Sequence, residues 1–178
     1  MTHFAVTAVG ADRPGIVAAV TRAFVDHGCN IEDSTMTILR GQFAMMLVVD
    51  APPGVGASQL EYALATPAAE LDLVVAVRPA SDEAGDLPEG GSWTVSVHGA
   101  DRPGIVHGVT SLLAERWVNI VDLSTRVVGS PERPGYTMVL EVTLPPGAEP
   151  EELERALEAK AAELGVACRL HPSEADIL

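Results

Sequence analysis

Aromatic residues and cysteines are scarce in this sequence. Phe, Trp and Tyr together make up 4% of the 178 residues, so the hydrophobic core has to be built mainly from Val, Leu, Ile, Ala and Met. The two cysteines, Cys29 and Cys168, form no Cys-x-x-Cys pair and no metal-ligand cluster. Isolated thiols of this kind fit a reducing compartment.

Basic residues and long apolar runs are also few. The chain has 11 Lys and Arg against 25 Asp and Glu, a formal net charge of −14, and such a surface repels phosphate backbones. The longest strongly apolar run, Phe43–Val49, is too short to span a bilayer, and Met1–Phe4 has no basic or apolar leader. We therefore expect a cytoplasmic protein that binds neither nucleic acid nor membrane directly.

Motifs of catalysis are missing as well. The sequence has no Gly-x-Ser-x-Gly, no P-loop and no dinucleotide fingerprint, and no pair of histidines has the His-x-x-x-His spacing of a metal site. The five histidines are His3, His27, His98, His107 and His171. The sequence thus predicts a protein that is not an enzyme and has no metal ion or cofactor.

What the chain does contain is an internal duplication. Gly10–Val17 recurs letter for letter as Gly99–Val106, an offset of 99 − 10 = 89 residues. Beyond a loop that holds Pro131–Gly135, the offset becomes 138 − 45 = 93 and persists to the end of the repeat. The matched pairs include Val6 and Val95, Asn30 and Asn119, Met45 and Met138, Leu64 and Leu157, and Pro79 and Pro172. This identity, followed by a second offset that stays constant to the end of the repeat, indicates two copies of one unit.

The duplication predicts the domain boundaries. Residues 80–91 have no apolar periodicity and are typical of a solvated linker, so we expect domains at 1–79 and 92–172 and a tail at 173–178. Units of about 80 residues are only marginally stable alone, which favours packing against another domain or another chain.

Each unit begins with a strand and a helix. Phe4, Val6 and Ala8 alternate as one face of a strand, and Ile16, Val20 and Phe24 share one helical face. Asp12 is the expected N-cap of that helix, Pro14 stands in its first turn, and Gly28 suits its C-terminal end.

Two strands, a second helix and a last strand follow. Strand-like runs at about 30–39 and 42–50 are joined by a turn at Arg40–Gly41. A helix carrying Leu60, Leu64 and Leu71 precedes a last strand with Val75 and Val77. The pattern βαββαβ, present twice, predicts an α+β chain of two ferredoxin-like domains, each an antiparallel sheet with two helices on one face.

The loop motif resembles that of the ACT domain. Asp-Arg-Pro-Gly-Ile-Val between strand and helix, followed about fifteen residues later by Asn-Ile, is similar to this family over residues 3–79 and 92–172. Two such domains in tandem resemble the group of glycine cleavage system transcriptional repressors, which act through partner proteins rather than by reading DNA. The resemblance implies an amino-acid-sensing regulatory protein that binds a small amino acid, such as glycine or serine, and a regulatory protein partner.

The same resemblance implies where the ligand binds. In ACT domains it lies at an interface between two domains and touches the first strand–helix loop and the start of the second strand. The corresponding residues are Asp12, Arg13, Pro14, Gly15, Ile16, Asn30 and Ile31 in the first copy, and Asp101, Arg102, Pro103, Gly104, Ile105, Asn119 and Ile120 in the second. Serine-binding ACT domains have a His two residues before the loop position, where this chain has Gly10 and Gly99, so the identity of the amino acid stays open.

Elementary chemistry supports these positions. A free helix N-terminus suits an α-carboxylate, Asn30 or Asn119 can donate and accept hydrogen bonds, and Asp12 or Asp101 can meet an ammonium group. The plainer interpretation is that Asp-x-Pro-Gly only starts a helix.

Two other functions remain open at this point. The first is a ligand-free adaptor that uses its sheets for protein contacts. The second is an acylphosphatase-like hydrolase, which shares the βαββαβ plan and for which Arg13 with Asn30, and Arg102 with Asn119, offer the right residue types. The family's Gly-x-Val-x-Gly-Val-x-Phe-Arg pattern is missing, however, and Pro14 interrupts a loop that must present successive N–H groups.

The sheet faces that the helices leave open differ between the copies. In the first copy this face is largely apolar: Ala5, Thr7, Val9, Ala44, Met46, Val48, Val74 and Ala76. In the second it is polar: Thr94, Ser96, His98, Thr137, Val139, Glu141, Thr143, Arg169 and His171. Since a large apolar patch on a protein usually contacts something, we expect a homodimer that buries the first face, although such residues also simply make good strands.

Overall fold

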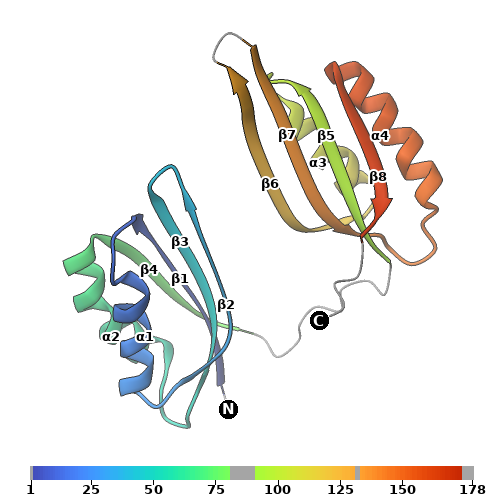
Figure 1. Ribbon diagram of the computed structural model, residues 1–178. Coiled ribbons are helices and arrows are strands. Elements are labelled where there is room, and N and C mark those ends of the chain that lie inside the picture. The colour runs from blue at the N-terminus through green and yellow to red at the C-terminus, as the bar shows by residue number, and fades with distance from the viewer. Residues whose placement is uncertain (1, 81–90, 131–132, 174–178) are drawn as a thin grey trace. The chain divides into compact units, whose positions relative to one another are not determined.

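The computed structural model describes residues 2–80, 91–130 and 133–173 of the chain (Figure 1). The chain divides into two compact units, Met1–Ala84 and Gly85–Leu178. Most of the expected linker (81–90) and tail (174–178) lies outside the described residues. The boundaries that we expected for them therefore stay predictions.

Both units have the element order βαββαβ. The first consists of β1 (Thr2–Ala11), α1 (Ile16–Asp26), β2 (Asn30–Leu39), β3 (Gln42–Ala51), α2 (Ala57–Leu71) and β4 (Leu73–Pro79). The second consists of β5 (Ser92–Ala100), α3 (Ile105–Glu115), β6 (Asn119–Ser130), β7 (Arg133–Thr143), α4 (Pro150–Leu164) and β8 (Val166–Pro172). The predicted duplication and α+β class are confirmed.

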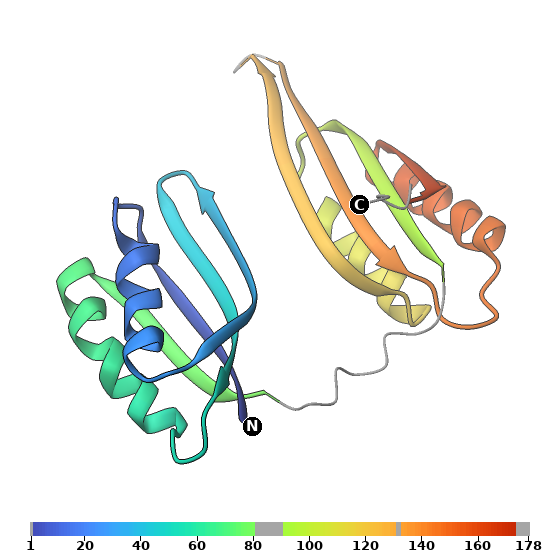
Figure 2. The same cartoon turned by 60° about the horizontal axis from the view of Figure 1, so that its bottom comes forward.

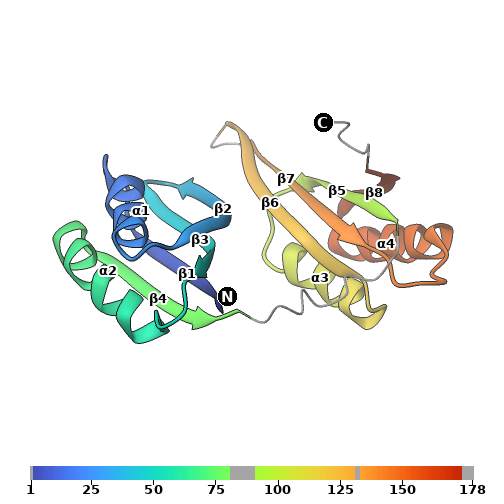
Figure 3. The same cartoon turned by 90° about the horizontal axis from the view of Figure 1, so that it is seen from below.

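Each unit forms one four-stranded antiparallel sheet. The strand orders are β2-β3-β1-β4 and β6-β7-β5-β8. Figure 3 shows α1 and α2 together on one face of the first sheet, and Figure 2 shows α3 and α4 likewise on one face of the second. Among the described residues, no helix lies on the opposite face of either sheet.

Aliphatic side chains between sheet and helices form each core. In the first unit, Val6 and Leu47 from the sheet meet Val20 of α1 and Leu64 of α2, all nearly inaccessible to solvent. The three phenylalanines of the chain, Phe4, Phe24 and Phe43, lie in this core. Leu140, Leu113 and Leu157 have the same role in the second core. Burial on this scale drives folding, since each fully buried large side chain contributes about 1.5–3 kcal/mol.

Two local expectations need correction. The N-cap of α1 is Gly15 in a left-handed conformation (φ 94°), with no side-chain cap, so Asp12 does not cap this helix and Pro14 lies before it. The same geometry recurs at Gly104 (φ 94°) before α3, so Asp101 is no cap there. The second hairpin is also tighter than expected, because β7 already begins at Arg133.

Other expectations are confirmed. β2 has the predicted bounds, and Arg40 and Gly41 both have the positive φ that a two-residue hairpin turn requires. No helix in the described ranges combines the length and apolarity needed to cross a membrane.

Candidate ligand-binding loops

The duplicated loop before each first helix is open to solvent. Asp12, Arg13, Pro14 and Gly15 are all exposed, and the backbone N–H of Asp12 donates to the carbonyl of Gly41 at 2.9 Å. The first bond within α1 runs from the Ala19 N–H to the Gly15 carbonyl at 2.9 Å. The N–H groups of the first turn therefore have no acceptor within the helix, and they form a weakly positive end suited to an anionic group.

Two glycines that precede the loops lie close against the start of the neighbouring strand. A Cβ built on Gly10 would lie 2.6 Å from the carbonyl oxygen of Asp72 and 2.7 Å from Leu73 Cδ2. A Cβ on Gly99 would lie 2.6 Å from Val166 Cγ1. Because β4 and β8 start so close to these positions, neither position has room for a histidine like the one in serine-binding domains.

The arginine of the second loop packs against its own domain. A Cβ built on Gly165, which caps the C-terminus of α4, would lie 2.6 Å from Nη1 and 3.4 Å from Cζ of Arg102. A guanidinium at this place interacts favourably with the negative end of the helix. Arg102 therefore lies beside the end of α4, although it is exposed to solvent, as are the flanking Asp101, Pro103 and Gly104.

Asn30 lies at the other end of the sheet from Asp12. β1 and β2 are both antiparallel to β3, with Asn30 opposite Asp50, Leu39 opposite Gln42 and Ala11 opposite Gln42. β1 and β2 therefore run in the same direction, and nine strand residues separate the Asn30 end from the loop end, roughly 25–30 Å. Asn119 is related to Asp101 in the same way. Within one domain, the structure does not bring the two halves of the expected site together.

Several groups gather around Asn30 that sequence reasoning missed. Asp50 is the register neighbour of both Asn30 and His3, and His3 Nε2 lies 3.2 Å from Glu32 Oε2. Asp50 Oδ1 is buried without a hydrogen-bond partner among the described residues. Burial, and secondarily the charge of Asp50, raises the pKa of the Cys29 thiol. The turn at Arg40–Gly41 does predict that β2 pairs with β3. Counting residues from this turn does not give the partner of Asn30, however, because a bulge between Ile31 and Asp33 shifts the pairing of the two strands by one residue.

The Asn119 end is less charged. Asn119 lies opposite Thr143, and Val121 takes the place of Glu32. Thr143 is buried although we expected it on the open face, where Val139 and Glu141 of the same strand are exposed. The two asparagines thus have different surroundings despite the duplication.

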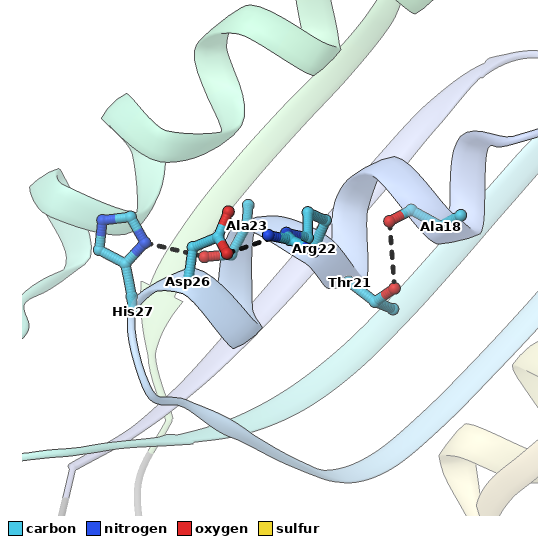
Figure 4. A network of polar contacts seen from close by, with 6 residues as sticks. All are labelled: Ala18, Thr21, Arg22, Ala23, Asp26 and His27. Atoms are coloured by element: carbon cyan, nitrogen blue, oxygen red, sulfur yellow. Dashed lines mark hydrogen bonds and ion pairs between the residues drawn. The ribbon is translucent and has the colours of Figure 1, made fainter.

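The outer faces of the helices carry ordinary surface networks. In α1, Arg22 Nε lies 2.9 Å from Asp26 Oδ1, His27 Nδ1 lies 2.8 Å from the Ala23 carbonyl, and Thr21 donates to the Ala18 carbonyl at 3.3 Å (Figure 4). Within residues 2–80, 91–130 and 133–173, no three His, Cys, Asp or Glu side chains are grouped so that they could hold a metal ion.

Comparisons with known proteins agree with this architecture. The ACT domain family model matches residues 2–78 and 94–171. The chain is 29% identical over 164 residues to the glycine cleavage system transcriptional repressor of Escherichia coli, covering 91% of this chain and 85% of that protein. It is also similar to the crystal structure of an unknown protein from Galdieria sulphuraria, with a TM-score of 0.83, 29% identity, and coverage of 97% and 99% of the two chains.

Proposed function

The chain belongs to the ACT domain family, and on that premise we propose that it is a regulator of amino-acid metabolism that binds a small amino acid and acts through a protein partner. The observation that carries the proposal is the duplicated Gly-Ala-Asp-Arg-Pro-Gly-Ile-Val loop, which ends in a left-handed glycine and leaves a helix N-terminus exposed. The similarity to a protein named as a glycine cleavage system transcriptional repressor supports it. With a net charge of −14, such a regulator acts without binding DNA itself.

The loop recognises the groups that all amino acids share. The α-carboxylate meets the free N–H groups of the first turn of α1 or α3, and the ammonium group meets the Asp12 or Asp101 carboxylate. Because Gly10 and Gly99 leave no room for an additional side chain, recognition of the ligand's own side chain is weak. This arrangement favours a small ligand such as glycine or serine.

A second domain supplies the asparagine. An amino acid is far shorter than the 25–30 Å or so between Asp12 and Asn30 of one domain, so a site that uses both draws them from two domains. We place the second domain in another copy of the chain. If the open faces of two first sheets pack about a two-fold axis perpendicular to the strands, the loop end of one sheet lies over the Asn30 end of the other.

The open face of the first sheet suits this contact. Val9, Met46 and Val74 on it are 47%, 48% and 76% exposed in the single chain. On the corresponding face of the second sheet, the exposed Val139 of β7 and Val128 of β6 lie among threonine, serine and charged residues. An apolar face of this kind is stabilised by burial against a partner.

The alternatives fit the geometry less well. An acylphosphatase-like site needs its arginine and asparagine close together, whereas Arg13 and Asn30 lie at opposite ends of the sheet. A ligand-free adaptor needs no exposed helix N-terminus. The adaptor differs from the sensor in one measurable respect, which is that no amino acid raises its melting temperature.

The test is a thermal-shift screen over the common amino acids followed by subunit mixing. In an Asn119→Ala background, chains with Asp12→Ala and chains with Asn30→Ala should each fail to bind the amino acid found. An equimolar mixture should regain about a quarter of the parent's sites, because half the dimers are mixed and each mixed dimer has one intact site. No melting shift with any amino acid at millimolar concentration would favour the adaptor, and no recovery on mixing would remove the two-chain site.

A further inference from the structure

Trp117 is held in a backbone conformation that tryptophan rarely adopts. Its φ is 58°, in the left-handed region, at the turn that ends α3. The Trp117 N–H donates to the Ala114 carbonyl at 3.0 Å, and the Val118 N–H donates to the Leu113 carbonyl at 3.0 Å. This is the usual glycine-ended helix terminus, and a residue with a Cβ is disfavoured there.

The first domain has the expected glycine at the same place. Gly28, 89 residues earlier, ends α1 with φ 69° and the same pair of backbone bonds, from Gly28 to Val25 at 3.1 Å and from Cys29 to Phe24 at 3.0 Å. The turn therefore does not need a tryptophan to form. The indole is also not part of the core, because Trp117 is 84% exposed. A strained backbone that holds a large apolar side chain in solvent indicates a functional contact.

A depression adjoins this tryptophan. It has a volume of about 300 Å³, and Arg116 and Val118 on either side of Trp117 line it, together with Pro145, Pro146, Glu149 and Glu152. In the first domain, a Cβ built on Gly28 would lie 3.8 Å from Pro52, the counterpart of Pro145. The lining of the depression is therefore partly apolar, from Val118 and the two prolines, and partly formed by the N-terminus of α4, while Trp117 lies in the chain between two of its lining residues.

The acidic groups at this depression are specific to the second domain. Glu149 is the N-cap of α4, and Glu151 and Glu152 lie in its first turn, all three exposed. At the offset of 93 residues, the first domain has Gly56, Ser58 and Gln59 instead. The tryptophan and the three glutamates therefore occur together in the second domain, and both features are missing from the first.

We propose that Trp117 and the adjoining depression form the docking surface for a basic segment of a partner protein, which inserts an apolar side chain beside the indole and sets lysine or arginine against Glu149 and Glu152. Charge decides between this occupant and a second copy of the chain. A second copy carries the same −14 charge and would bring like charges together, whereas a basic segment is attracted. Tryptophan with a neighbouring arginine is also the composition typical of interface hot spots.

Nuclear magnetic resonance of the full chain tests this directly. The chain has two tryptophans, so a ¹⁵N-labelled sample gives two indole N–H resonances, and the one lost in Trp117→Gly belongs to Trp117. The probes are two synthetic peptides with the same leucines, one with lysines and one with glutamates. The lysine peptide should shift the Trp117 resonance to saturation, while the glutamate peptide leaves it in place.

Variants that copy the first domain sharpen the test. Trp117→Gly should fold as well as the wild type, since glycine suits this turn, and should bind the lysine peptide about tenfold more weakly or worse. Glu152→Gln should weaken binding roughly threefold, whereas Glu158→Gln, a matched charge change farther along α4, should leave it unchanged. Trp117→Phe, which keeps an aromatic ring, should bind better than Trp117→Gly.

Three results would overturn the proposal. The first is that the wild type and Trp117→Gly bind the lysine peptide with equal affinity. The second is that the Trp117 indole resonance does not respond to the lysine peptide. The third is that Trp117→Gly sediments as a smaller species than the wild type, which would assign the surface to a second copy of the chain. The inference rests on the proposed partner-dependent function, yet its assay contains no amino acid. If the lysine peptide binds but no amino acid shifts the melting temperature, only the amino-acid sensor proposal is refuted. If an amino acid shifts the melting temperature but the lysine peptide does not bind, only the docking-surface proposal is refuted.

Discussion

The guanidinium of Arg102 occupies the space beside Gly165 at the C-terminal end of α4, so that a Cβ on this glycine would lie 2.6 Å from Nη1. The corresponding turn of the first domain has no glycine at this position. The counterpart of Gly165 is Asp72, which adopts the same left-handed conformation with φ 56°. The contact places the guanidinium of the second loop motif against its own helix layer.

This contact gives the first prediction. Gly165→Ala should lower the free energy of unfolding by about 1–2 kcal/mol, because alanine is strained at φ 68° and its Cβ meets Arg102. In an Arg102→Ala background the loss should be smaller. Asp72→Gly, the reverse change in the first domain, should be neutral or slightly stabilising. Urea denaturation measures all three, and an equal loss with and without Arg102 would show that the guanidinium is not in contact.

The second prediction concerns Gly10. Gly10→Ala should destabilise the first domain by more than about 2 kcal/mol, since its Cβ would meet a backbone oxygen that cannot move without shifting β4. Gly56→Ala is the matched control, because a Cβ at Gly56 meets nothing within 4 Å and the backbone there is extended. Since Gly56 is the N-cap of α2, its replacement should lower the free energy of unfolding by no more than the cost of changing an N-cap, about 1 kcal/mol. A fully stable Gly10→Ala would show that the position tolerates a side chain and would reopen the comparison with serine-binding domains.

The third prediction concerns the open face of the first sheet. Met46→Glu and Val48→Glu should convert a dimer into a monomer, because each places a charge in the apolar contact. Val139→Glu, the corresponding change on the polar face of the second sheet, should leave the dimer intact. Sedimentation at tens of micromolar measures the mass, and a wild-type monomer under those conditions would remove the proposed interface.

The fourth prediction follows from the pKa of Cys168. Burial raises the pKa of this thiol from about 9 to about 11, and the nearby Glu158 adds to the effect. The folded chain therefore keeps this proton at a pH where the unfolded chain loses it, so stability is full below about pH 9 and falls as the pH rises towards 11. Replacing the thiol in Cys168→Ala should flatten this decline in urea unfolding curves between pH 8 and 11. An unchanged slope would assign the decline to other groups.

Much of the fold could be predicted from the sequence. The repeat, the bounds of β2, the turn at Arg40–Gly41 and the core positions Val6, Val20 and Leu64 follow from periodicity and turn chemistry, which are local. Asp12 was wrong as an N-cap because the left-handed conformation of Gly15, a backbone property, sets the helix start.

The candidate site was less predictable. That Asp12 and Asn30 lie at opposite ends of one sheet depends on the strand order and on β1 and β2 running in the same direction, which periodicity does not reveal. Trp117 was overlooked although its signal was present, since alignment of the two copies sets it against Gly28 at a helix end. Residues that break the repeat where the backbone is special are the ones to examine first.

The central claim is that the duplicated loop and asparagine bind an amino acid, and calorimetric titration with glycine and with serine tests it most directly. The wild type should give saturable heat with one of them, and the ligand at 100 times its Kd should stabilise the fold by about 2.7 kcal/mol. The Asn30→Ala/Asn119→Ala chain should melt at the same temperature without ligand and bind at least about tenfold more weakly, a loss of roughly 1.4 kcal/mol. Unchanged affinity in that chain, or no heat with the wild type, would contradict the account.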